Sequence, residues 1–150
     1  MPLFAKEKHG DGGFVRRILV ATDRSQTADH AVAWAAEMAR RYEAELVVLQ
    51  VAIGGAAASI EDLQQYAAEV AGERGIARIA SGEEPAQVIC EVGEDEDVDV
   101  IVVGNVGMSG RKEFLLGNVP NRVSHNTRRT VIIVNTAAAL EEPKKKRFWQ

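Results

Sequence analysis

Four short apolar runs rich in β-branched residues constrain the fold of this chain more than any other feature of its sequence. They are VRRILVAT (15–22), ELVVLQVA (45–52), VDVIVVG (98–104) and TVIIVNT (130–136). Because apolar residues fill these runs nearly throughout, they predict strands that are buried on both faces, as in a parallel sheet. A weaker run, IARIAS (76–81), predicts a further strand at the edge of the sheet.

The segments between these runs have the spacing of amphipathic helices. Apolar residues three, four and seven positions apart predict a first helix over 28–42, with Ser25 or Thr27 as its cap. A third helix is predicted to begin near Pro85, because proline favours the first helical turn. The fourth is predicted to be short, from about residue 118 to residue 127.

The second helix is predicted from its two ends. Ser59-x-x-Asp62 resembles a capping box, and apolar residues follow it at helical spacing. Gly72 and Gly75 are predicted to stop this helix, since glycine is the usual residue after a helix C-terminus.

Strands that alternate with helices predict the α/β class, with a single open parallel five-stranded sheet covered by helices on both faces. No internal repeat or interdomain linker is present in the sequence. We therefore expect one domain over residues 14–137, between an N-terminal tail (1–13) and a basic C-terminal tail (138–150).

Composition restricts the chemistry and the location of the chain. Cys90 is the only cysteine, which excludes an intrachain disulfide and every metal site built from several cysteines. The longest apolar runs are only a few residues, far below the about 18–20 that a membrane span needs. The N-terminal segment has no apolar signal region. We expect a cytoplasmic protein without a metal site of its own.

The charge is unevenly distributed along the chain. There are 18 basic and 22 acidic residues, a net charge of −4, so we expect no specific binding of nucleic acid. The C-terminal tail nevertheless contains KKKRFW (144–149), four cations beside two aromatic residues. This segment predicts a weak, salt-sensitive contact with an anionic surface or an acidic partner, or else a solubilising end with no partner.

The residues that follow the strands are the candidates for ligand binding, because open parallel sheets bind ligands at the carboxyl ends of their strands. Residues 104–110 contain three glycines, and Gly117 and Asn118 precede the last helix. Glycine can take positive φ and approach a ligand closely, and a helix N-terminus favours an anion. The two segments predict a phosphate cradle. Asp23, after the first strand, is predicted to accept from a ribose or to help hold a metal ion, or alternatively to cap the first helix.

The glycine spacing resembles that of the nucleotide-binding branch of the universal stress protein family. The family pattern is G-x2-G-x9-G-[ST], and this chain has Gly104, Gly107, Gly117 and then Asn118 at the same spacing. ILVATDRS is similar to the first strand and acidic loop of that family, and TVIIVNT is similar to its last strand. The resemblance extends over residues 15–136.

The resemblance implies a Rossmann-like sheet in the strand order 3-2-1-4-5 and an adenine nucleotide as ligand. ATP, accompanied by Mg²⁺, is the first expectation, and cyclic AMP is the second. Asp23, with Ala21 beside it, would contact the adenosine, and Val51 would meet the adenine through its backbone. The residues implied to hold the phosphates are Gly104, Gly107, Gly117, Asn118 and Val119.

Two positions depart from the family pattern. Asn118 replaces Ser or Thr and lacks their hydroxyl, and Arg24 stands where the family usually has Gly. That arginine could pair with phosphate or simply occupy room near the pocket. Both departures favour an alternative function, a ligand-free dimeric adapter that acts through protein partners.

The sequence also bears on catalysis and assembly. Ser109 and Ser124 have no nearby His–Asp arrangement in the sequence, so we expect no enzyme activity beyond weak ATP hydrolysis or self-phosphorylation. The run TVIIVNT contains no charge or proline that would prevent edge-to-edge pairing. Since the family dimerises through this strand, the resemblance implies a homodimer through residues 131–135.

Overall fold

The five predicted strands form one parallel sheet in the computed structural model, which describes residues 15–52, 59–105 and 119–136. The order β3-β2-β1-β4-β5 confirms both the sheet predicted from the apolar runs and the order implied by the resemblance. Every neighbouring pair is parallel. The strands are β1 (Arg17–Thr22), β2 (Glu45–Ala52), β3 (Gly75–Ser81), β4 (Val100–Gly104) and β5 (Thr130–Val134).

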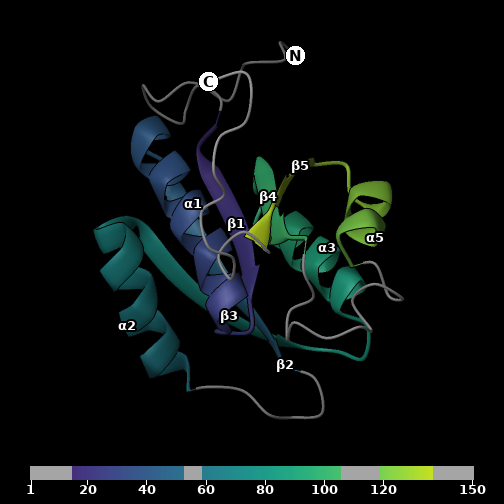
Figure 1. The fold of residues 1–150 in the computed structure, drawn as a ribbon, viewed down its shortest axis with the longest axis horizontal. Coiled ribbons are helices and arrows are strands. Elements are labelled where there is room, and N and C mark those ends of the chain that lie inside the picture. The colour runs from purple at the N-terminus through teal and green to yellow at the C-terminus, as the bar shows by residue number, and fades with distance from the viewer. Residues whose placement is uncertain (1–14, 53–58, 106–118, 137–150) are drawn as a thin grey trace, which may run out of the picture.

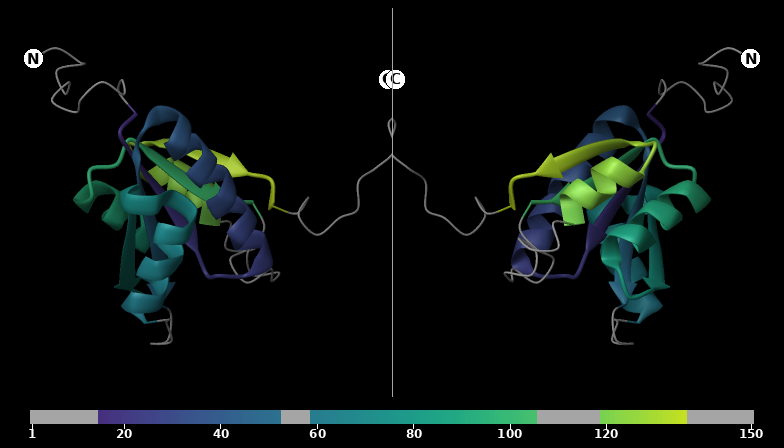
Figure 2. Two further views of the ribbon diagram at one scale, coloured as in Figure 1. Left: turned by 90° about the vertical axis from the view of Figure 1, so that its left-hand side faces the viewer. Right: turned by 90° about the vertical axis from the view of Figure 1, so that its right-hand side faces the viewer.

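The helices cover both faces of this sheet, as predicted. Helices α1 and α2 lie on one face, and α3 and α5 lie on the other (Figure 1); the left view of Figure 2 has the first pair nearest the viewer and the right view the second pair. The chain moves outward from β1 to β3 and then returns to β4, and right-handed crossovers in opposite directions place their helices on opposite faces. The helices are α1 (Gln26–Tyr42), α2 (Ile60–Ala71), α3 (Pro85–Asp95) and α5 (Val119–Asn126), and the short 3₁₀-helix η2 spans Gly72–Arg74.

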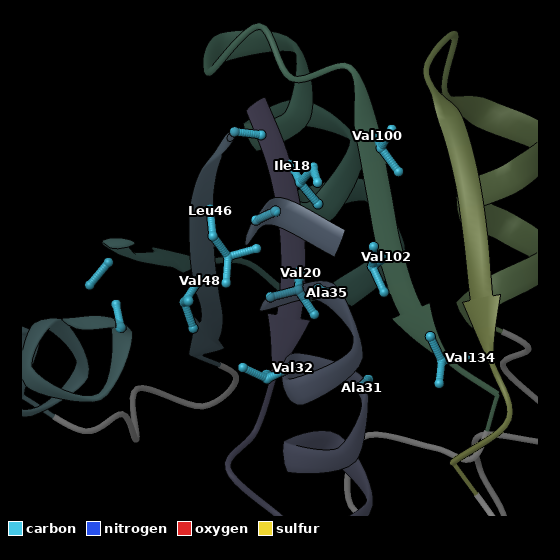
Figure 3. Close-up of a cluster of buried hydrophobic side chains, with 14 of the residues drawn as sticks. Ile18, Val20, Ala31, Val32, Ala35, Leu46, Val48, Val100, Val102 and Val134 are labelled. Carbon is cyan, nitrogen blue, oxygen red and sulfur yellow. The ribbon is translucent and has the colours of Figure 1, made fainter. Parts of the chain in front are cut away.

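The buried strands divide the core into two apolar layers. Successive side chains of a strand point to opposite faces, so Ile18 and Val20 pack under α1 (Figure 3), whereas Leu19 and Ala21 pack on the side of α3 and α5. Because β1 is buried on both faces, its sequence is apolar at almost every position. This explains why the continuous apolar runs identified the central strands. For the run TVIIVNT the prediction of burial on both faces was wrong, because β5 lies at the edge of the sheet and Ile133 is 44% exposed.

The predicted helix starts are confirmed. The Ser25 hydroxyl accepts from the Ala28 amide at 3.2 Å and caps α1, which decides between Ser25 and Thr27. Ser59 caps α2 in the same way, with the Asp62 amide donating at 3.0 Å. Pro85 begins α3 as expected.

The predicted stop after α2 is divided between the two glycines. Gly72, with φ of 62°, ends α2, and Gly75 caps the short helix η2 that follows and is also the first residue of β3. A Cβ at Gly75 would lie 2.2 Å from the carbonyl oxygen of Ala67. Glycine is therefore required there because the edge strand passes directly against the backbone of α2.

Among the described residues, no helix has both the length and the apolar character that crossing a membrane requires. Both predicted tails, residues 1–13 and 138–150, lie outside the described part of the chain, and so does the basic segment 144–149. The domain limits and the partner expected for that segment stay predictions.

Candidate functional site

The carboxyl edge of the sheet is the candidate site. Strands β1 and β4 lie side by side, and the chain leaves β1 toward β2 but leaves β4 toward β5. This is the point in an open parallel sheet where the connections diverge and where ligands usually bind. The segments that meet there are the loop from β1 to α1, containing Asp23, and the end of β4 at Gly104.

Hydrogen bonds from its own side chains order the loop between β1 and α1. The Asp23 carboxylate accepts from the Ser25 amide at 2.9 Å, and the Thr22 hydroxyl accepts from the Arg24 amide at 2.9 Å. Ser25 then caps α1. The side chain of Asp23 therefore orders the turn before the helix, while the residue remains partly exposed at the carboxyl edge.

Arg24, which stands where the resemblance implies glycine, has a backbone conformation that favours glycine. Its φ is 68°, in the left-handed region that glycine enters without the Cβ penalty of other residues. Its guanidinium lies 3.5 Å from the centre of the Tyr66 ring, and its Nε donates to Asp29 Oδ1 at 3.1 Å. The Tyr66 hydroxyl donates to the same oxygen at 3.0 Å. Arg24 thus connects the loop to both α1 and α2.

These contacts also fix the protonation of the two groups. Partial burial alone would lower the pKa of Arg24, but the hydrogen bond and charge of Asp29 outweigh it and raise that pKa above its ordinary value. Burial, with the nearby negative charge of Asp29, raises the pKa of Tyr66 well above its ordinary value. Tyr66 is therefore a neutral hydrogen-bond donor and Arg24 a permanent cation at neutral pH.

Three of the predicted ligand residues lie in one buried layer on the side of α3 and α5. Ala21, Val51 and Val119 are 6%, 7% and 8% exposed and belong to the same apolar cluster. Their side chains serve the core, so a ligand at this edge would reach them through backbone atoms. This agrees with the backbone contact implied for Val51. The remaining predicted ligand residues, Gly107, Gly117 and Asn118, lie outside the described part of the chain.

The expectation that Gly104 uses positive φ was wrong. Gly72 is the described glycine with positive φ, and Gly104 has no such conformation. A Cβ at Gly104 would instead lie 2.8 Å from Thr136 Cγ2 and 3.1 Å from Thr136 Oγ1. Glycine is needed at this position because Thr136, two residues after β5, packs directly on the end of β4.

Asn105 holds the two chain segments together at this point, and the sequence reasoning missed it. Its Oδ1 accepts from the Thr136 amide at 2.8 Å and from the Thr136 hydroxyl at 3.2 Å. The backbone amide of Asn105 donates to the Val134 carbonyl at 2.9 Å. The only available signal was an amide side chain directly after the first glycine of the spacing pattern. The start of the glycine-rich segment is thereby fixed to the end of β5.

The ion pairs near this edge show how its cations are used. Arg24 is paired with Asp29, and Arg122 at the beginning of α5 is paired with Glu84 before α3. In the described part of the chain no three His, Cys, Asp or Glu residues are grouped so that they could hold a metal ion. Mg²⁺ stays a prediction tied to ATP.

A groove of about 840 Å³ lies at the other edge of the sheet. It runs between the C-terminal halves of α1 and α2, with Ala36, Ala39 and Val70 among its lining residues. Because these helix ends precede the starts of β2 and β3, the groove is at the amino edge and is separate from the candidate site.

Comparisons with known proteins agree with this geometry. A family model described as "Universal stress protein family" matches residues 15–81 and 53–135. Universal stress protein YxiE of Bacillus subtilis is 29% identical over 144 residues, which cover 79% of this chain and 97% of that protein. A crystal structure of a universal stress protein in complex with cAMP is 29% identical, with a TM-score of 0.67 over 81% of this chain and 98% of that one. UspA from Lactobacillus plantarum, at 22% identity and a TM-score of 0.66, shares the fold over 81% of this chain and 98% of its own.

Proposed function

This chain belongs to the universal stress protein family, and we propose that it binds an adenine nucleotide at the carboxyl edge of its sheet. The observation that carries the proposal is the position of the described candidate residues. Asp23 follows β1, Val51 lies near the end of β2, and Gly104 ends β4, at the edge where the connections of the sheet diverge. An acidic side chain beside the carboxyl ends of these strands suits a nucleoside.

The relative in complex with cAMP supports an adenine nucleotide rather than another ligand class, because it covers most of this chain. ATP remains the first candidate from the glycine spacing, with Mg²⁺ as its companion, and cyclic AMP is the second. Arg24 and Arg122, two cations near this edge, are already paired with Asp29 and Glu84, and this affects the choice between ATP and cyclic AMP. ATP carries more negative charge than cyclic AMP and therefore depends more on Mg²⁺, on backbone amides or on other cations.

Thermal unfolding with each ligand tests the proposal. A ligand at 100 times its dissociation constant stabilises the fold by about 2.7 kcal/mol. We expect this shift with ATP and Mg²⁺ or with cyclic AMP, and none with GTP. Nucleotide extracted from freshly purified protein identifies the natural ligand. No shift with any adenine nucleotide, together with an empty extract, contradicts nucleotide binding and supports the adapter.

A variant at Asp23 locates the site. Asp23→Asn keeps an oxygen that can accept from the Ser25 amide but removes the charge. We expect weaker nucleotide binding, because hydrogen bonds to charged acceptors are the stronger ones, and a modest loss of stability because the bond from the Ser25 amide is weakened for the same reason. Glu37→Gln is the matched control, since Glu37 is an exposed carboxylate on α1 that accepts from Arg40 and Arg41. Equal affinity in the Asp23 variant and the control contradicts a site at this loop.

The homodimer belongs to the same proposal. In the described sheet β5 pairs only with β4, and Ile133 on this edge strand is 44% exposed. An apolar edge strand without charge or proline is suited to pairing with a second copy. Sedimentation should give a dimer for the natural chain and a monomer for Ile133→Lys. A natural chain that stays monomeric at micromolar concentration contradicts this part of the proposal.

A further inference from the structure

Three side chains distant in sequence meet beside the candidate site. Arg24 comes from the loop after β1, Asp29 from the first turns of α1, and Tyr66 from the middle of α2. Asp29 Oδ1 accepts from both of the others, at 3.1 Å from Arg24 Nε and at 3.0 Å from the Tyr66 hydroxyl, and the guanidinium lies 3.5 Å from the Tyr66 ring centre. We call these three residues the Arg24 clamp.

The backbone of Arg24 shows that the clamp has a conformational effect. A residue with a Cβ is disfavoured at φ of 68°, so the loop would not keep this conformation without compensating contacts. The contacts of the Arg24 side chain with Asp29 and Tyr66 supply that compensation. The clamp therefore stabilises the loop conformation, together with the hydrogen bonds that Thr22 and Asp23 accept within the loop.

Asp23 is directly affected by this conformation. It immediately precedes Arg24, and its carboxylate accepts from the Ser25 amide, immediately after Arg24. The Arg24 amide itself donates to Thr22. A rotation at Arg24 would move the Ser25 amide away from Asp23 and release the carboxylate from its position at the carboxyl edge.

We propose that the Arg24 clamp positions Asp23 for the nucleoside and that Arg24 is a positioning residue, not a phosphate ligand. The inference rests on the proposed function for its ligand. The position of the Arg24 side chain supports this role. Its guanidinium lies over Tyr66 and is paired with Asp29, on the face of the sheet covered by α1 and α2. The buried candidate residues Ala21 and Val51 belong to the layer on the opposite face.

The two possible roles of Arg24 predict different ligand dependence. If Arg24 acts through Asp23, its substitution weakens the binding of adenosine and of ATP by the same factor, because both ligands contain the nucleoside. A phosphate ligand affects ATP and leaves adenosine unchanged. In the second case Asp29→Ala would also free the arginine and strengthen ATP binding.

The experiment measures dissociation constants of adenosine and of ATP with Mg²⁺ for the natural chain, Arg24→Ala, Asp29→Ala and the double variant. Alanine keeps the Cβ that disfavours φ of 68° but lacks the contacts with Asp29 and Tyr66, so Arg24→Ala removes the clamp and leaves the backbone strain uncompensated. Glu37→Ala is the matched control, because it also removes a carboxylate of α1 that pairs with arginine. Hydrogen exchange of the Ser25 amide in the ligand-free protein reports the loop conformation independently.

Positioning predicts that each single variant weakens both ligands by the same factor, about fivefold, which is the size expected for losing a partly exposed ion pair and a cation–π contact. The double variant should be no weaker than the single variants, because both disrupt one cluster. Exchange at Ser25 should become faster in Arg24→Ala and in Asp29→Ala but not in Glu37→Ala. Tyr66→Phe keeps the ring and should lose less than Asp29→Ala.

A loss confined to ATP overturns the inference, and so do single-variant factors that multiply in the double variant. Natural affinity together with natural Ser25 exchange in Arg24→Ala also overturns it. If the natural chain binds neither ligand, the proposed function has failed, and Ser25 exchange still decides on the clamp. Faster exchange of the Ser25 amide in the variants then supports stabilisation of the loop by the Arg24 clamp, and unchanged exchange contradicts it.

Discussion

Replacing Gly104 by alanine should destabilise the fold through one identifiable collision. The added Cβ would lie 2.8 Å from Thr136 Cγ2, about 0.6 Å inside the 3.4 Å at which ordinary contact begins. Thr136 cannot turn away at no cost, because its amide and its hydroxyl both donate to Asn105 Oδ1. The collision therefore has to be relieved by moving the end of β4 or by breaking these hydrogen bonds.

The size of the effect follows from opposing contributions. Overpacking in a well-packed region costs about 1–3 kcal/mol. Replacing glycine by alanine also stabilises the fold by about 0.4–1 kcal/mol where alanine can adopt the backbone conformation, because it reduces the conformational entropy of the unfolded chain. Because Gly104 lacks positive φ, this gain applies, and we expect a net loss of about 1–2 kcal/mol in the free energy of unfolding. Urea unfolding followed by circular dichroism measures it.

A second substitution identifies the collision as the cause. Thr136→Ser removes the methyl group Cγ2 but keeps the hydroxyl that donates to Asn105. Alone it should cost about 1 kcal/mol, since Thr136 is buried. Combined with Gly104→Ala it should return the stability to near that of the natural chain, because the new methyl occupies the space of the lost one. If the double variant loses the sum of the two single losses, the packing explanation of Gly104 is refuted.

Three further predictions concern single positions. Gly72→Ala should cost about 1–3 kcal/mol in urea unfolding from backbone strain alone, since φ of 62° with ψ of −140° lies in a region that residues with a Cβ rarely adopt, and no atom lies within 4 Å of the added Cβ; no change in stability would contradict this. The hydrogen bond from Arg129 lowers the pKa of Glu94 in the folded chain. A carboxylate whose pKa is lowered by folding stabilises the fold at pH values above its unfolded pKa, and this contribution is lost as the pH falls through its folded pKa. Glu94→Gln should therefore be less stable than the natural chain at neutral pH, with a difference that disappears in urea unfolding at acidic pH; a difference independent of pH would argue against the pair. Burial, and then the charges of Glu94 and Glu91, raise the pKa of Cys90, so Ellman's reagent should react far more slowly with the folded chain than with the chain in urea, and equal rates would show an accessible thiolate.

The sheet was predictable because its signal is local and repeated. Each central strand is buried on both faces, so each run of apolar residues identified a strand without reference to any other part of the chain. The helix caps Ser25 and Ser59 were predictable for the same reason, since a capping side chain bonds an amide three residues away. The strand order came from the resemblance to the family and not from these local patterns.

The contacts that shape the candidate site were not predictable, because their partners are far apart in sequence. Tyr66 donates to Asp29 across 37 positions, and Asn105 accepts from Thr136 across 31. Nothing around Tyr66 distinguishes it from an ordinary packing residue of an amphipathic helix. Only the fold, which places α2 beside α1, makes this tyrosine a neighbour of the loop after β1.

Arg24 and Gly104 show why the glycine pattern alone misjudges this site. At position 24 the backbone takes a conformation that favours glycine, yet the chain has an arginine whose contacts with α1 and α2 offset the strain. At position 104 the chain has the expected glycine, but in an unstrained conformation and for lack of space beside Thr136. At both positions, a neighbour distant in sequence determines which residue the structure accommodates. The effect of a substitution at either position should therefore depend on that neighbour, Asp29 or Thr136, more than on the family pattern itself.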